Sequence, residues 1–297
     1  MRVAVIGAGH MGRYHAEKFS RLAGVELAAV VDSDPARARI ADFRSVLERI
    51  DAAVIAVPTD RHHEVARACL EKGLHLLVEK PLAATLEQAD ELVALARAKN
   101  VVLQVGHVER YNKAFRAMSE RMDRPRFIDA ERLSGFKQRG AEVDVILDLM
   151  IHDLDLAVAL ARSEVESVSA TGFPVLTRDI DIANARIEFA NGCVANLAAS
   201  RVSQAAVRKL RVFQPGVYVS ADLQAGSLRY VKQSGGSMEQ SEERHEGGDA
   251  LAAQAESFVL AVAKKQAVAV DGEQGRRVLK LALDVGRLVR ERLERFA

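Results

Sequence analysis

The first 117 residues alternate short apolar runs with longer segments of mixed polarity. The apolar runs are continuous, which is typical of strands that are buried on both faces of a parallel sheet. The segments between them have the length and periodicity of helices. This pattern predicts a doubly wound (Rossmann) α/β domain over residues 1–117, with parallel strands at RVAVI, VELAAVV, AAVIAV, LHLLVE and VVLQVG.

A different pattern begins after Pro125. One helix is expected over about residues 145–161, and two more are expected over about 250–265 and 274–295. Strands that are segregated from helices predict an α+β domain over residues 118–297, built on a largely antiparallel open sheet. The predicted strands are VESVSATGF, NARIEFA, CVANLAASRV, RKLRVFQ, VYVSADL and SLRYV.

Two further expectations concern this second domain. The polar, glycine-rich stretch over residues 233–248 predicts a loop. An open sheet usually buries its uncovered face, and a second copy of the chain is the simplest partner. We therefore expect a homodimer or homotetramer that forms through the C-terminal sheet.

Composition excludes several classes of protein. The 297 residues include 42 Lys and Arg against 41 Asp and Glu, a balance that gives no reason to expect nucleic-acid binding. No apolar run approaches the roughly 20 residues of a membrane span. Because the first strand is predicted to begin at Arg2, we expect no signal peptide. Cys69 and Cys193 match no metal-ligand spacing and indicate buried thiols in a reducing compartment. We expect a cytoplasmic protein without a metal, a membrane or a nucleic-acid partner.

A glycine-rich loop follows the first strand. Gly7 permits a tight turn, Gly9 lets the backbone approach a phosphate, and Gly12 lets the next helix pack on the strand. The N–H groups at the start of that helix then face the anion. Asp32 ends the second strand about 20 residues later, where a carboxylate accepts the ribose hydroxyls of a dinucleotide. Together these residues predict a nicotinamide cofactor site.

The charge of Asp32 also bears on the choice of cofactor. A carboxylate there repels a 2′-phosphate, which favours NAD over NADP. Arg37 and Arg39 lie nearby in the sequence and would weaken that preference.

Chemistry is expected where the parallel strands end, because ligands of doubly wound sheets bind beyond the carboxyl ends of the strands. The loops PTDRHH, EKP and GHVERYN follow three of the predicted strands. Lys80 directly follows LHLLVE, so its ammonium would reach the crevice beside the nicotinamide, where it can polarise an oxygen. The alternative is an ordinary solvated lysine.

The predicted helix over residues 145–161 carries a second candidate group. Asp148, His152 and Asp155 are spaced so that they lie on one face of an otherwise apolar helix. Burying such groups without partners costs about 2–7 kcal/mol for even a neutral polar group. This pattern favours a catalytic histidine with carboxylate partners. The alternative is a core imidazole held by two acids.

Basic residues in the second domain could bind an anionic substrate, because arginine pairs bidentately with phosphate. The alternative for each is a residue that keeps a strand edge soluble. The candidates are Lys137, Arg139, Arg201, Arg208, Lys209 and Arg211.

Four motifs together resemble the Gfo/Idh/MocA family of nicotinamide-dependent sugar oxidoreductases: GAGHMG, PTDRH, EKP and DLMIHDLD. The resemblance covers both domains, and EKP followed later by D-x-x-x-H is its most specific part. It implies that Lys80, Asp148 and His152 form the catalytic set, with His152 as proton acceptor. We expect substrate contacts from His107, Arg110, Lys137, Arg139 and Arg201. The cofactor residues expected from the glycine loop and the resemblance are Gly7, Gly9, His10, Met11, Gly12, Asp32, Pro58, Thr59, His62, Glu79 and Lys80.

Within that family, GHVERYNKAF and the segment from ASRVS to VSADL are most similar to a subgroup associated with lipid A biosynthesis, which oxidises the 3-hydroxyl of UDP-N-acetylglucosamine. We therefore expect an NAD-dependent dehydrogenase that acts on a secondary alcohol of a sugar or sugar nucleotide. The alternatives are a dehydrogenase or reductase for another polyol or carbonyl substrate, and a non-catalytic NAD-sensing protein.

Overall fold

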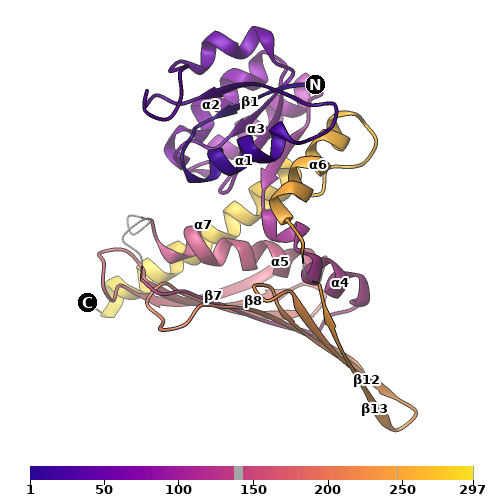
Figure 1. Cartoon of the computed structure of the whole chain (residues 1–297). Coiled ribbons are helices and arrows are strands. Elements are labelled where there is room, and N and C mark those ends of the chain that lie inside the picture. Colours follow the sequence, from indigo (N-terminus) through magenta and orange to yellow (C-terminus); the bar gives the residue numbers. More distant parts are fainter. Residues whose placement is uncertain (137–142, 246, 297) are drawn as a thin grey trace. The chain divides into compact units, whose positions relative to one another are not determined.

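A computed structural model describes residues 1–136, 143–245 and 247–296 (Figure 1). The chain forms two compact units, each made of two separate segments. The first unit is Met1–Tyr111 with Asp249–Leu279, and the second is Asn112–Gly248 with Lys280–Ala297. A single boundary after residue 117 does not describe this arrangement, because a C-terminal segment returns to the first unit.

The first unit contains the expected parallel sheet. Its strands have the order β2-β1-β3-β4-β5, and every neighbouring pair is parallel. The strand order reverses between β1 and β3, which is where doubly wound sheets bind ligands. The strands are β1 (Arg2–Ile6), β2 (Glu26–Val31), β3 (Ala52–Ile55), β4 (His75–Glu79) and β5 (Leu103–Gly106). The helices are α1 (His10–Ser20), the 3₁₀ segments η1 (Phe43–Arg49) and η2 (Val108–Tyr111), α2 (Thr59–Glu71), α3 (Leu86–Lys99) and α6 (Ala250–Val262).

Both faces of this sheet are covered, as the continuous apolar strands predict. Phe19 of α1 and Phe258 of α6 lie in one cluster with Val3, Val54 and Leu77 of the sheet. Helices α2 and α3 pack against each other, and right-handed crossovers place them on the opposite face. The returning helix α6 thus completes a layer that α1 begins, which explains why residues 249–279 belong to this unit.

The second unit is built on an eight-stranded sheet with the order β13-β12-β11-β10-β6-β9-β8-β7. All pairs are antiparallel except β6 with β9. The strands are β6 (Phe127–Leu133), β7 (Val165–Phe173), β8 (Ile182–Phe189), β9 (Val194–Ser200), β10 (Val207–Gln214), β11 (Val217–Asp222), β12 (Ser227–Ser234) and β13 (Ser237–Arg244). The helices are α4 (Lys113–Arg121), the π-helical turn η3 (Ile146–Met150), α5 (Ile151–Ala161) and α7 (Gly272–Phe296), whose first residues lie in the first unit.

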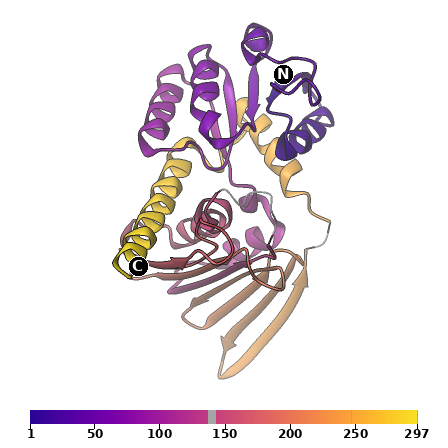
Figure 2. The ribbon, with the colours of Figure 1, turned by 90° about the vertical axis from the view of Figure 1, so that its left-hand side faces the viewer.

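Helices cover one face of the eight-stranded sheet, with α5 and α7 lying along it (Figure 2). The burial of β8 alternates strictly, because Ala183, Ala185 and Ile187 are buried while Asn184 and Arg186 are exposed. Such alternation is typical of a sheet with one covered face. The predicted fold class, a Rossmann sheet plus a largely antiparallel open sheet, is confirmed.

The prediction of a loop over residues 233–248 is wrong for most of that stretch. Strands β12 and β13 pair from Ser227 with Arg244 to Ser234 with Ser237. Gly235 and Gly236 both have positive φ, 55° and 88°, as a two-residue type I′ hairpin requires. The residues of β13 are exposed on both faces apart from one, so no apolar alternation marked it as a strand.

Candidate functional site

The glycine loop has the geometry of a phosphate cradle. Gly7 has a φ of 96°, and a Cβ on Gly12 would collide with the carbonyl oxygen of Gly7. Gly9 differs, because no described atom lies within 4 Å of the position that its Cβ would take. Gly9 also precedes α1 without capping it through a side chain, so the first N–H groups of α1, from His10 and Met11 onward, remain suited to an anion.

Asp32 braces this loop from the end of β2. Its Oδ2 accepts a hydrogen bond of 2.7 Å from the N–H of Ala8, and its Oδ1 accepts one of 2.9 Å from the N–H of Asp34. The guanidinium of Arg37 lies 4.0 Å from Oδ2 and is more than half exposed. The carboxylate is therefore fixed beside the glycine loop, where a dinucleotide would place its ribose.

A buried ion pair occupies the end of β4. His15 Nε2 of α1 lies 2.6 Å from Glu79 Oε1, and the two residues are 0% and 8% exposed. Burial by itself would raise the pKa of Glu79, but the hydrogen bond and charge of His15, together with Lys80 and His62, hold that pKa below its ordinary value. Glu79 therefore carries its negative charge at neutral pH, directly before the half-buried Lys80.

His62 holds the backbone on the other side of Lys80. Its Nδ1 lies 2.8 Å from the carbonyl oxygen of Pro81, and its Nε2 lies 3.0 Å from that of Val57. Burial lowers the pKa of His62, against the two carbonyls and Glu79, which act to raise it. The neutral ring has one N–H, so it can donate to only one of these two carbonyls at a time. His62 was expected to line the cofactor cleft, and the structure shows both of its nitrogens facing protein carbonyls.

The remaining candidates of the first unit also follow the ends of its strands. Pro58 precedes α2 and Thr59 is its first residue, after β3. His107 follows β5 and is 1% exposed, while Arg110 lies in η2 and is half-buried. The loops after β1, β3, β4 and β5 thus meet at the carboxyl edge of one parallel sheet, with Asp32 at the end of β2.

The helical candidates lie in the second unit. Asp148 belongs to the π-helical turn and His152 to α5, and both are half-buried, whereas Asp155 is 2% exposed. Single π-helical turns inside helices occur frequently at functional sites. Sequence periodicity did not indicate this turn. Lys80 lies in the other unit, so its convergence with His152 stays a prediction.

An unpredicted ion pair attaches α5 to the sheet. Arg132 of β6 donates from Nε to Asp153 Oδ2 (3.0 Å) and from Nη2 to Asp153 Oδ1 (2.8 Å), and both residues are nearly fully buried. Asp153 directly follows His152. The bidentate pair therefore fixes the rotation of α5 and with it the direction in which His152 leaves the helix.

The expected substrate-binding arginines have other surroundings. Arg201 is 4% exposed and donates from Nε to Asp181 (2.8 Å) and from its Nη atoms to the carbonyls of Val143 (2.6 Å) and Ile180 (3.0 Å). Arg211 pairs with two acids of β6. Arg201 thus has a structural role, which its position at a strand end did not reveal. Lys137 and Arg139 lie outside the described residues.

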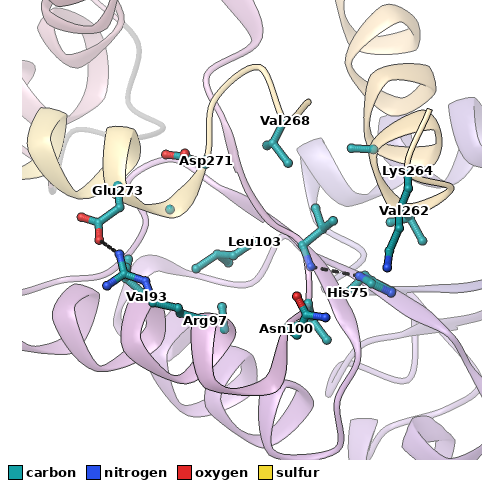
Figure 3. Close-up of a pocket in the computed structure, with 15 residues that line it drawn as sticks. His75, Val93, Arg97, Asn100, Leu103, Val262, Lys264, Val268, Asp271 and Glu273 are labelled. Carbon is teal, nitrogen blue, oxygen red and sulfur yellow. Dashed lines mark hydrogen bonds and ion pairs between the residues drawn. The ribbon is translucent and has the colours of Figure 1, made fainter. Parts of the chain in front are cut away.

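A cavity of about 330 Å³ lies at the opposite, amino edge of the parallel sheet (Figure 3). His75, Leu103 and Lys264 line it, and His75 Nδ1 accepts a hydrogen bond of 3.0 Å from Val102 N–H. Its position separates it from every cofactor candidate. Among the described residues, no group of three or more His, Cys, Asp or Glu could hold a metal ion. Likewise, none of the described helices has the length and apolarity that crossing a bilayer requires.

Comparisons with known proteins agree with this architecture. Residues 1–107 match the model of the Gfo/Idh/MocA oxidoreductase family with an NAD-binding Rossmann fold, and residues 114–214 match the Gfo/Idh/MocA C-terminal domain. UDP-N-acetylglucosamine 3-dehydrogenase from Acidithiobacillus ferrooxidans is 38% identical, over 99% of both chains. A solved structure of that enzyme superimposes with a TM-score of 0.91 over 97% of each chain.

A second relative is a polyol enzyme. The NAD⁺-dependent scyllo-inositol 2-dehydrogenase of Bacillus subtilis is 31% identical over 68% of both chains. The matches confirm the predicted fold, the enzyme class and the resemblance drawn from the four motifs. The chain belongs to the Gfo/Idh/MocA family of NAD-binding oxidoreductases.

Proposed function

We propose that this enzyme oxidises the 3-hydroxyl of UDP-N-acetylglucosamine to a ketone with NAD⁺. The observation that supports this substrate most strongly is the full-length similarity to the enzyme from A. ferrooxidans, which extends through the second unit. The inositol dehydrogenase is similar over about two thirds of the chain. A free polyol is therefore the second candidate substrate.

The residues of the first unit fit a nicotinamide dinucleotide. Gly9 leaves room for a pyrophosphate, the start of α1 supplies N–H donors, and Asp32 is placed for ribose hydroxyls. The Asp32 carboxylate would repel a 2′-phosphate, so NAD is the proposed cofactor. Arg37 does not reverse this preference, because it lies at the limit of ion-pair distance and also pairs with Asp34.

When bound, the nicotinamide supplies the hydride acceptor at its C4. His152 takes the proton of the substrate hydroxyl as general base, because histidine is the side chain that most readily exchanges a proton near neutral pH. Asp148 orients that imidazole and stabilises it once it is protonated. The Lys80 ammonium donates a hydrogen bond to the reacting oxygen and stabilises the negative charge that develops there. The ion pair of Asp153 with Arg132 holds the helix so that His152 keeps the orientation that proton transfer requires.

The test is formation of NADH with UDP-N-acetylglucosamine, UDP-glucose, myo-inositol and scyllo-inositol. We expect turnover with the acetylated sugar nucleotide and at least about 100-fold lower kcat/KM with the free polyols. Lys80→Ala and His152→Ala should each lower kcat by about 10²- to 10⁴-fold while NADH still binds. Lys99→Ala, on the exposed end of α3, is the matched lysine control. Turnover of an inositol alone would assign the polyol function, and NADH binding without turnover of any alcohol would indicate the sensing alternative.

We also propose that the open face of the eight-stranded sheet joins two copies of the chain. Phe127, Phe213 and Tyr218 form an aromatic cluster on this face, with ring centroids 5.8 and 4.8 Å apart, and Phe213 is 37% exposed. Phe213→Arg should convert the dimer or tetramer to monomers in sedimentation velocity, and a monomeric parent would refute the interface.

Cys69 and Cys193 are unpaired and buried, which favours the proposed cytoplasmic location.

A further inference from the structure

The glycine loop is followed by a histidine that none of the steps above uses. His15 lies on α1, three residues after Gly12, and is fully buried. Its Nε2 lies 2.6 Å from Glu79 Oε1, across 64 residues of sequence. No described group is a hydrogen-bond partner of its Nδ1, so Glu79 is the ring's one described hydrogen-bond partner. Buried polar groups usually have a hydrogen-bond partner, and for His15 that partner is Glu79.

Glu79 is confined from a second side by β5. A Cβ on Gly106 would lie 2.9 Å from the Cα of Glu79 and 3.1 Å from its Oε2, so the β5 backbone lies close to this residue and leaves no room for a side chain at position 106. The carboxylate is therefore bounded by His15 of α1 on one side and by the β5 backbone on the other. The titratable groups that face it are His15 of α1, His62 of α2 and the adjoining Lys80.

We propose that His15 is a positioning residue for the reaction, which holds Glu79 ionised and fixed so that Glu79 orients and charge-balances Lys80. The inference rests on the proposed role of Lys80. The buried carboxylate is the counter-charge of the Lys80 ammonium, and His15 is the group that keeps this carboxylate charged. Helix α1, whose N-terminus would bind the cofactor phosphates, thereby also helps to position the lysine that is proposed to contact the reacting oxygen.

The test compares two His–Glu pairs of the same unit. His15→Phe keeps a ring of similar shape, next to the existing ring of Phe19, but removes the hydrogen bond. His63→Phe removes the matched pair of His63 Nε2 with Glu91 Oε2 (2.8 Å), which is exposed and lies between α2 and α3. His15→Phe should lower kcat by about 10- to 100-fold with the KM for NAD⁺ changed less than about threefold. His63→Phe should change neither.

Two readouts separate positioning from packing. Without His15, burial raises the pKa of Glu79, so the acid limb of the kcat profile should move to higher pH. In cofactor-free protein, the ¹³C signal of the Glu79 carboxyl should stay ionised across about pH 5–8 in the parent and titrate in His15→Phe. His15→Gln, whose amide can still donate to Glu79, should recover most of kcat and of the ionised signal, and it remains informative if His15→Phe does not fold.

An unchanged kcat and pH profile in a folded His15→Phe enzyme would overturn the inference, and so would a rise in the KM for NAD⁺ alone. A lowered kcat without titration of Glu79 would show that His15 acts by packing, which also overturns it. The proposed function fails separately, because full activity of Lys80→Ala would remove the catalytic lysine whatever His15 does.

Discussion

In the parallel sheet, strands β1, β3 and β4 bury apolar side chains on both faces, and the ionised groups come only where the strands end, as with Glu79. In the eight-stranded sheet, by contrast, charges are buried within the layer between the sheet and its helices. Arg132 and Asp153 join β6 to α5, and Arg201 and Asp181 join two loops at the sheet edge. The first unit therefore builds its sheet on apolar packing and has its buried His15–Glu79 pair at a strand end, beside the candidate site, whereas the second unit uses buried ion pairs to fix the directions of its elements.

The apolar half of this contrast is tested by Phe258→Ala. Phe258 is fully buried and packs edge-on against Phe19, with ring centroids 6.2 Å apart. The cavity should destabilise the first unit by about 3–5 kcal/mol, whatever the salt concentration. Denaturant unfolding measures the loss of stability, and hydrogen exchange shows in which unit the loss of protection occurs. A loss of protection confined to the second unit would contradict the assignment of α6 to the first.

The ionic half is tested by Asp181→Asn. Asp181 is fully buried and accepts hydrogen bonds of 2.6–2.8 Å from the N–H groups of Val175, Leu176 and Thr177, besides its pair with Arg201. Leaving the guanidinium unpaired should cost roughly 3 kcal/mol in the second unit. The control is the double variant Asp181→Asn with Arg201→Met, which should regain part of the loss because no buried charge is left unpaired. A double variant less stable than the single one would contradict this.

The same carboxylate predicts how the stability of the second unit depends on pH. Burial alone would raise the pKa of Asp181, but the three backbone N–H groups and Thr177 hold it far below its ordinary value. A depressed folded pKa gives stability that is complete above about pH 4 and is lost as the pH falls below that. The second unit should thus lose on the order of 2 kcal/mol on acidification, and Asp181→Asn should lose less over the same range. If the free energy of unfolding fell with decreasing pH to the same extent in the parent and in Asp181→Asn, this prediction would be refuted.

The smallest effect is expected at the β12–β13 hairpin. Gly235→Ala with Gly236→Ala places side chains at two positive φ values, which costs about 1–2 kcal/mol per residue locally. Because β13 is exposed on both faces, this strand can open alone, and the melting temperature should fall by less than about 2 °C. Amide hydrogen exchange measures this, and we expect faster exchange in β12 and β13 only. A large fall in the melting temperature would show that the hairpin is part of the cooperative unit.

The contrast also explains what could be predicted from the sequence. Strands that are apolar throughout are marked by composition alone, so the parallel sheet, its glycine loop and Lys80 at the end of β4 could all be found. The strands β7 to β12 of the second sheet were also found. The strands β6 and β13 and the short helix α4 were missed. Strand β13 is exposed on both faces apart from one residue, so it carries no apolar alternation. Strand β6 has charged residues on both faces, and α4 is only nine residues long.

Partnerships across long sequence separations were the other omission. Nothing local pairs His15 with Glu79, Arg132 with Asp153, or Arg201 with Asp181, and nothing local sends α6 back to the first sheet. The one available signal was His15 itself, a histidine inside the first helix of a dinucleotide fold, and its partner could be identified only in three dimensions. Arg201 was misinterpreted for the same reason, since an arginine for phosphate and an arginine for a buried acid look alike in sequence.

The return of α6 to the sheet that α1 begins has a consequence for biosynthesis. On the ribosome, the first unit cannot complete its apolar layer until residues 249–279 have been translated. Phe19 and its neighbours therefore lack their contact with Phe258 during the synthesis of the whole second sheet. A gene fragment ending near residue 117 would lack that helix and should yield an aggregating polypeptide. The same fragment supplied with residues 249–279 on a linker should be recovered as a stable nucleotide-binding module.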